Sequence, residues 1–377
     1  MTLAMLLMMA AISVNATVRV INMDKDSDLR QILGPDTLTV DSIKFTGYIA
    51  HKEFEAIGLF TYFKLEYIDL GECSVENNEI PDHGFSPDPW AFKWDDETDY
   101  YTRYTRLKHV ILPENIEKIG AVAFCNCIRL EHLNLPKNLK EIGDEALSGL
   151  HSLKPAHLTL PDGLTVLEVR VLADTNLESV TFPKSLEKIS VCSFQNSTRL
   201  KSLYLPEGLK EIEGSAFTGL FRCGIIVLPS TLERMENAAI RVDNDTCKVY
   251  IKTKVPPVMA SSRAFEGKED LTLYVPVGAK AAYEAAPVWK EFKEIVEVSQ
   301  FPSAGVEAVL SDGAADVRVY GTDGAAVIDG DGVGYAVYSA DGLQVATGIA
   351  DGKTEISLPS GLYIVRTSKR ATKIAVK

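Results

Sequence analysis

The sequence predicts two folded parts: a parallel repeat solenoid built from units of 22–25 residues, and a small all-β sandwich after it. Each unit is expected to hold one β-strand and short helical turns. Two observations lead to this fold class. A Leu-Pro or Phe-Pro step occurs six times between residues 112 and 229, and Asp-Gly pairs recur through the last 75 residues.

The repeat is defined by its prolines and by apolar residues at fixed distances from them. The prolines are 23, 25, 22, 23 and 23 residues apart: Pro113, Pro136, Pro161, Pro183, Pro206 and Pro229. Apolar residues stand three residues before each proline and three, six and eleven residues after it. One such unit cannot bury its own apolar face, so stacked units must share a core. Further strand patterns at 65–70, 249–252 and 273–276 extend the predicted series to nine strands over residues 65–276.

The consensus L-x-x-I-x-L-P-x-x-L-x-x-I-x-x-x-A-F-x-x-C, most complete at 107–127 and 200–217, resembles the BspA-like branch of bacterial leucine-rich repeats. The resemblance implies a leucine-rich repeat solenoid over 65–276 and an N-terminal cap over 17–64. It also implies a C-terminal cap at 277–300, expected as an amphipathic helix carrying Tyr283, Trp289 and Phe292. Proteins of this family are associated with adhesion to host extracellular matrix and to other cells.

The composition changes after Pro302. Residues 303–377 hold 11 of the 26 glycines and no Cys, Phe or Trp. Asp-Gly pairs separate alternating apolar runs such as 335–338, which is typical of β-hairpins. The stretch 329–332 could suggest a calcium loop, but it lacks the further acidic ligands, so a turn is favoured. The runs at 337–342, 358–365 and 373–377 resemble the C-terminal sorting domain of type IX secretion, which implies a role in export.

The N-terminal residues 1–16 are predicted to be a signal peptide. The apolar run 3–12 is too short to span a bilayer, and Val14-Asn15-Ala16 is typical of a signal-peptidase site. No Lys or Arg precedes the run, so a buried N-terminal helix is the alternative. A signal peptide predicts a mature protein that is extracellular or at the cell surface.

Charge and motifs exclude several function classes. Lys and Arg number 39 against 52 Asp and Glu, a net charge of −13, which argues against binding to nucleic acid or to anionic lipid. Phosphate-binding, zinc-protease and nucleophile-elbow motifs are absent from the sequence, so it predicts neither enzyme activity nor a cofactor. Six cysteines are too few for a disulfide scaffold. Cys125, Cys127 and Cys223 are expected to be buried thiols, with a disulfide or a metal site as the alternatives.

Two exposed positions in each unit carry charges that alternate in sign between neighbouring units. The first series is Glu117, Lys140, Thr165, Glu187, Lys210 and Glu233. The second series is Lys118, Glu141, Val166, Lys188, Glu211 and Arg234. Opposite charges facing each other across a ladder stabilise it by a few tenths of a kcal/mol, so both series are expected to fix the register of stacking.

One outward strand position holds His109, His132 and His157 in consecutive units, with Tyr67 one unit before. Neighbouring strands lie ~4.8 Å apart, so two or three imidazoles could share a metal. A partner-contact patch and a plain polar ladder are the alternatives. The second outward position is mixed, with the tyrosines as aromatic anchors: Ile111, Asn134, Thr159, Thr181, Tyr204, Val227, Tyr250 and Tyr274.

An insertion is predicted at about 86–106, where the next strand begins late. It carries Trp90 and Trp94, and residues 76–99 hold eight acids and one lysine. Long loops in compact domains are often functional, and clustered aromatic side chains are costly to leave in water. The insertion is therefore expected either to pack on the repeats or to contact a partner.

Together these features predict an exported, non-enzymatic binding protein, adhesin-like, that presents a repeat surface to protein or glycan partners, host extracellular matrix among them. The alternative is a structural surface or assembly component with no dedicated ligand. Neither reading involves nucleic acid or membrane insertion. The candidate contact residues are Tyr67, His109, His132, His157, Tyr204, Trp90 and Trp94.

Overall fold

The computed structural model describes residues 18–86, 105–302, 318–329, 333–339, 344–350, 353–367 and 371–376. Contacts within the chain divide it into Met1–Ser299 and Gln300–Lys377. The predicted signal peptide and most of the insertion, with Trp90 and Trp94, lie outside the described residues. Within the described part, no helix is long and apolar enough to cross a membrane.

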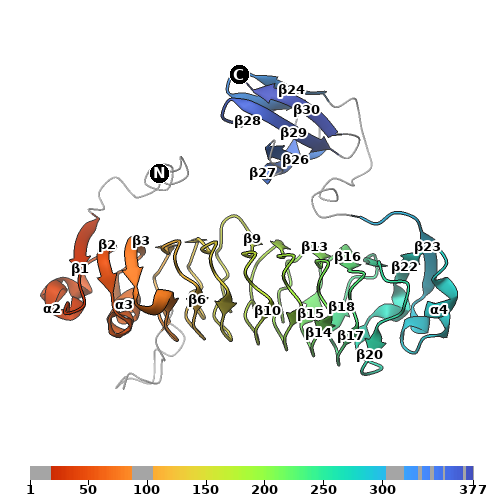
Figure 1. Ribbon diagram of the computed structural model, residues 1–377, viewed down its shortest axis with the longest axis horizontal. Helices are drawn as coiled ribbons and strands as arrows, with labels where there is room; N and C mark the ends of the chain where they lie inside the picture. Colours follow the sequence, from red (N-terminus) through yellow and green to blue (C-terminus); the bar gives the residue numbers. More distant parts are fainter. Residues whose placement is uncertain are drawn as a thin grey trace. The chain divides into compact units, whose positions relative to one another are not determined.

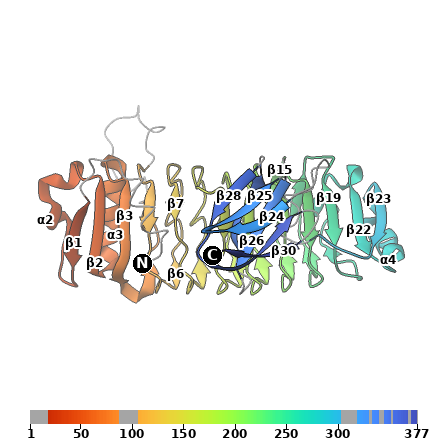
Figure 2. The ribbon, with the colours of Figure 1, turned by 90° about the horizontal axis from the view of Figure 1, so that it is seen from above.

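The first unit is a row of parallel strands (Figures 1 and 2), which confirms the predicted repeat fold. It starts with β1 (Arg19–Met23), β2 (Ser42–Ile49) and β3 (Tyr67–Val75), joined by α2 (Leu29–Leu33), the 3-10 turn η1 (Gly34–Leu38) and α3 (His51–Phe63). The helix α3 was not predicted. It buries Phe54, Ile57 and Phe60, and its buried Glu53 accepts a hydrogen bond from the N–H of Leu29 at 2.9 Å.

Each repeat contributes one strand to a first ladder and a two-residue strand to a second. After β3, the first ladder is β5 (His109–Ile111), β7 (His132–Leu133), β9 (His157–Thr159), β11 (Ser179–Thr181), β13 (Ser202–Tyr204), β16 (Ile225–Leu228), β19 (Lys248–Ile251), β22 (Thr272–Pro276) and β23 (Glu294–Val298). The second ladder, which follows the 3-10 turn η2 (Glu76–Asn78), is β4 (Glu79–Ile80), β6 (Lys118–Ile119), β8 (Glu141–Ile142), β10 (Val166–Leu167), β12 (Lys188–Ile189), β14 (Glu211–Ile212), β17 (Arg234–Met235) and β20 (Val258–Met259). A third, short ladder is β15 (Phe217–Leu220), β18 (Ile240–Val242) and β21 (Phe265–Glu266).

Both main ladders are interrupted at one shared place, which we call the seam, and the first ladder is interrupted again between β11 and β13. Hydrogen-bonded pairing joins neither β7 to β9 nor β8 to β10, all of which are described strands. The unit at the seam is the 25-residue one. The N–H of Lys154 donates to the Glu131 carbonyl (2.8 Å), so strand β9 begins out of register with strand β7. The corner turns remain joined, since the N–H of Leu147 donates to the carbonyl of Val171 (3.0 Å).

The core is a column of large apolar side chains with tight turns at its corner. Phe85 stacks on Phe124 at 4.6 Å between ring centroids, and Phe194 stacks on Phe217 at 5.0 Å. Two columns of left-handed residues border the corner turn. The first column holds six different residue types: Val122, Glu145, Arg170, Cys192, Ser215 and Ala238. The second holds only residues that tolerate positive φ: Asn126, Gly149, Asp174, Asn196 and Gly219.

The C-terminal cap differs from the single helix expected over 277–300. Its helix α4 is short (Lys280–Ala285), because Ala286 is extended before Pro287. The 3-10 turn η4 (Lys268–Asp270) precedes the cap, and η5 (Trp289–Glu291) lies within it. The alternating residues 294–298 form strand β23, which pairs with β22. The expected apolar residues do seal the end, since the buried Trp289 Nε1 donates to the Pro257 carbonyl at 2.9 Å.

The second unit is built from antiparallel strands. One sheet pairs β24 (Arg318–Thr322), β25 (Ala325–Asp329) and β28 (Lys353–Ser357). The other pairs β27 (Gln344–Ala350), β26 (Val333–Ser339), β29 (Gly361–Thr367) and β30 (Ala371–Val376). Gly324 has a φ of 77° in the turn between β24 and β25, as the Asp-Gly hairpin prediction requires. Residues 330–332 lie outside the described residues, as do the other predicted Asp-Gly turns.

Candidate functional site

The outward side chains of the first ladder form two rows. Strand residues alternate between core and surface, and the inward residues Val110, Leu203 and Val249 are at most 1 % exposed. We call the two outward rows the histidine row and the tyrosine row. The histidine row is Tyr67, His109, His132, His157, Ser179, Ser202, Ile225, Lys248 and Thr272. The tyrosine row, over the last five strands, is Tyr204, Val227, Tyr250, Tyr274 and Val296.

The histidine row begins with three rings in register. Tyr67 lies 6.1 Å from His109 between ring centroids, and His109 stacks on His132 at 4.8 Å with an interplanar angle of 18°. Burial lowers the pKa of His109, and the neighbouring His132 lowers it further, against the opposing effect of the carboxylates of Glu131 and Glu66. Tyr67 is itself buried, so it supports His109 more than it offers contact area.

The prediction that all three histidines lie on adjacent paired strands is wrong for His157. The seam separates β9 from β7, and His157 starts a separate two-stranded sheet with β11. Its ring instead lies among hydroxyls, with Nδ1 2.7 Å from Ser179 Oγ and Nε2 3.2 Å from Thr159 Oγ1. Partial burial lowers the pKa of His157. The two extra residues of the preceding unit explain why this strand leaves the ladder.

A metal site at the histidines has little support in the geometry. Over the ranges that the structure describes, no group of three or more His, Cys, Asp or Glu side chains could hold a metal ion. The stacked pair His109 and His132 offers two ligands, whereas zinc sites in proteins use three or four. What the pair does present is a flat, partly exposed aromatic surface.

The tyrosine row is the larger aromatic surface. Tyr250 stacks on Tyr274 at 4.5 Å with an interplanar angle of 16°. Val227 lies in register between Tyr204 and Tyr250 and is only 1 % exposed. The three tyrosines are partly exposed. The row therefore presents aromatic rings on three of four successive strands of one hydrogen-bonded sheet, with Val227 on the fourth.

Sequence reasoning located most of this strip but missed its last member. Val296 pairs with Tyr274, and it lies on β23 in the segment that was expected to be helical. The alternating pattern Glu-Ile-Val-Glu-Val at 294–298 was the available signal, because a half-buried strand reads this way.

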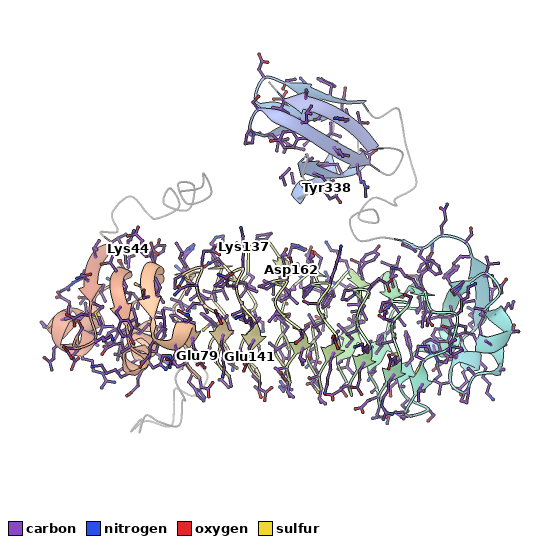
Figure 3. All side chains as sticks on the ribbon, viewed as in Figure 1. Lys44, Glu79, Lys137, Glu141, Asp162 and Tyr338 are labelled. Carbon is purple, nitrogen blue, oxygen red and sulfur yellow. The ribbon has the colours of Figure 1, made fainter. Side chains whose placement is uncertain are left out.

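The charged series form ion pairs along the second ladder, as predicted. Lys118 Nζ lies 3.2 Å from Glu79 Oε1 and 3.4 Å from Glu141 Oε1, and both carboxylates lie on one side of the repeats in Figure 3. Lys140 pairs with Glu117 at 2.7 Å. Because these charges are neutralised by neighbouring units, the second ladder is less suited than the first to recognise a charged partner.

A shallow hollow of about 360 Å³ lies at the corner turns, beside the exposed Phe221. Its arginines already hold carboxylates: Arg241 lies 3.1 Å from Asp243, and Arg263 lies 2.6 Å from Glu266. An anionic ligand would have to compete with these pairs. We therefore place the candidate site on the tyrosine row.

Comparison with known proteins agrees with this architecture. Residues 97–172 and 165–275 match the family described as BspA type leucine rich repeat region, in six copies. Residues 97–275 are therefore similar to BspA-type repeats. No curated protein matches the chain.

Three solved structures are similar to the chain. The pneumococcal vaccine antigen PcpA is 18 % identical, with 69 % of this chain and 80 % of that chain covered and a TM-score of 0.36. A leucine-rich repeat protein from Bacteroides ovatus is 16 % identical, with coverages of 74 % and 92 % and a TM-score of 0.37. A leucine rich cell surface protein from Faecalibacterium prausnitzii is 14 % identical, with coverages of 63 % and 84 % and a TM-score of 0.24.

Proposed function

We propose that the protein is an exported, non-enzymatic binding protein whose tyrosine row contacts a protein or glycan partner. The observation that carries this proposal is the strip of partly exposed rings at Tyr204, Tyr250 and Tyr274 on one sheet. Tyrosine combines a large apolar face with a polar hydroxyl, and it is enriched where proteins bind partners. A rigid sheet holds these rings in place before binding, which lowers the entropy lost on association.

Several properties narrow the class of partner. The net charge of −13 disfavours nucleic acid and anionic lipid surfaces. The BspA-like resemblance favours extracellular matrix proteins or surface glycans of host cells. Placement outside the cell depends on the predicted signal peptide and on the sorting-like second unit, and we propose the second unit as the export module.

The binding test uses the full chain on an immobilised panel of matrix proteins and glycans. The double variant Tyr250→Ser, Tyr274→Ser should lose at least tenfold in affinity for any ligand that the wild type captures, because two aromatic contacts are removed. A matched control, Glu187→Ser with Lys210→Ser, changes an ion pair on the second ladder and should bind as the wild type does. Equal binding by both variants would remove the tyrosine row from the proposal.

The same panel examines the other predicted contacts. Trp90→Ala with Trp94→Ala asks whether the insertion binds, and His132→Ala asks the same of the histidine row. A wild-type chain that captures no panel member, yet assembles into ordered arrays on its own, would instead favour the structural alternative. Export is measured separately, by following the chain to the cell surface with and without residues 303–377.

A further inference from the structure

The inward position at the start of each first-ladder strand forms a column that is leucine in most units. Except at the seam, where the exposed Pro155 takes this place, the described members are at most 3 % exposed: Leu65, Leu107, Leu130, Leu177, Leu200, Cys223, Cys247 and Leu271. Two consecutive units thus have cysteine where most others have leucine. Cysteine is much smaller than leucine, so this replacement needs a reason beyond filling the core.

The strand register brings the two thiols together. Lys248 N–H donates to the Gly224 carbonyl at 3.0 Å, so Cys247 stands beside Gly224 on the neighbouring strand, one residue from Cys223. With strands ~4.8 Å apart and a rise of ~3.3 Å per residue, the Cα atoms of Cys223 and Cys247 should lie about 5.8 Å apart. Disulfides most often join Cα atoms at such a separation. Both side chains belong to the same buried core.

We propose that Cys223 and Cys247 form a disulfide that joins two successive repeats when the chain folds in an oxidising compartment. The oxidant is a small or protein disulfide, such as glutathione disulfide. The first cysteine thiolate attacks it, forming a mixed disulfide and releasing one thiol. The second cysteine then attacks the mixed disulfide and releases the second thiol. One S–S bond is broken and one is formed; the two cysteines lose two electrons and two protons, and the oxidant is reduced to two thiols.

The reaction belongs to folding and not to the finished protein. Contact with Cys223 and burial raise the pKa of the Cys247 thiol, and only the thiolate reacts in exchange. Once the strands have stacked, the pair is sealed from solvent in either redox state. The disulfide would therefore form before the core closes, and it would afterwards resist reducing agents until the repeats unfold.

The test refolds the full chain from denaturant in a glutathione redox buffer and counts thiols in the denatured product. The chain has six cysteines, all of them described as free thiols in the structure. We expect four free thiols, a mass lower by two hydrogens, and a single bridged peptide pair containing Cys223 and Cys247. The loop closed by the bond spans 24 residues, so the oxidised protein should melt about 5 °C higher than the reduced protein.

Two variants make the result specific. Cys223→Leu restores the residue that Leu200 has in the same column, so it should fold, show five free thiols, and melt at one temperature in both redox buffers. Cys192→Ser, at a partly exposed corner residue, should keep the bridge. Six free thiols in the refolded wild type, or a bridge between any other pair, would overturn the proposal.

Discussion

Truncating the same core position in two different units should have unequal costs. Leu203 and Leu133 both stand three residues before the proline of their unit. Leu203 is 1 % exposed, whereas Leu133, next to the seam, is only partly buried. Leu203→Ala removes three buried carbons, about 2.4 kcal/mol of transfer free energy, and leaves a cavity, so we expect a loss of about 3–4 kcal/mol. Leu133→Ala should cost about 1–2 kcal/mol, because part of its side chain already meets water.

Urea unfolding followed by circular dichroism measures both losses. The variants must unfold with the wild-type dependence on urea, since a changed slope would mean that the unfolding reaction itself had changed. As an extreme case, Leu203→Asp would bury an unpaired carboxylate and should prevent the repeats from folding. The reasoning fails if Leu133→Ala costs as much as Leu203→Ala, or if Leu203→Asp melts within a few degrees of the wild type.

Three further predictions test the histidine pair, the corner turns and the domain boundary. Because the folded-state pKa of His109 is lowered, the unfolded chain binds more protons between that pKa and ~6.5, so stability should fall from pH 7.5 to pH 5.5. His132→Ala removes the neighbouring charge, so its melting temperature should drop less between the two pH values than that of the wild type. Identical drops in the two proteins would contradict this. Val122 has a φ of 60°, so Val122→Asn should raise the free energy of unfolding by up to about 1 kcal/mol. Asn126→Val should lower it by about 1–2 kcal/mol in the same unfolding assay. Changes of the opposite sign would refute the turn assignment. A chain ended at Pro302 should keep the melting transition of the repeats, and losing it would mean that the two units fold as one.

The sequence was most informative where a residue type is fixed by stacking. The spacing of the prolines, and the apolar residues at fixed distances from them, located the first-ladder strands. The alternating charges located ion pairs such as Lys210 with Glu187 at 2.8 Å. The sequence also marks the position of the seam. The charge series are broken only at Thr165 and Val166, beside the longest interval between prolines, and this is where β8 and β10 are not paired.

The errors arose where local pattern and tertiary context disagree. Tyr283, Trp289 and Phe292 do cover the last repeat, but Pro287 ends the helix that was expected to carry them. His157 has the correct position in its unit, yet the two extra residues before it take its strand out of the ladder. Position within a repeat predicts which face a side chain occupies. It does not by itself predict which strands pair, since β7 is not paired with β9, nor β11 with β13.

Continuous strand pairing also explains why the tyrosine row is the better candidate for recognition. From β13 to β23 the strands form one sheet, so Tyr204, Val227, Tyr250 and Tyr274 keep a fixed spacing set by backbone hydrogen bonds. The histidine row is divided by the seam after His132 and can offer only a short stacked pair as a single surface. Charges on the second ladder are neutralised within the chain, and so they stabilise register more than they attract a partner. The two ladders of one repeat thus have different roles. The charges of the second ladder fix how the units stack, and the first ladder presents the outward side chains that this stacking aligns.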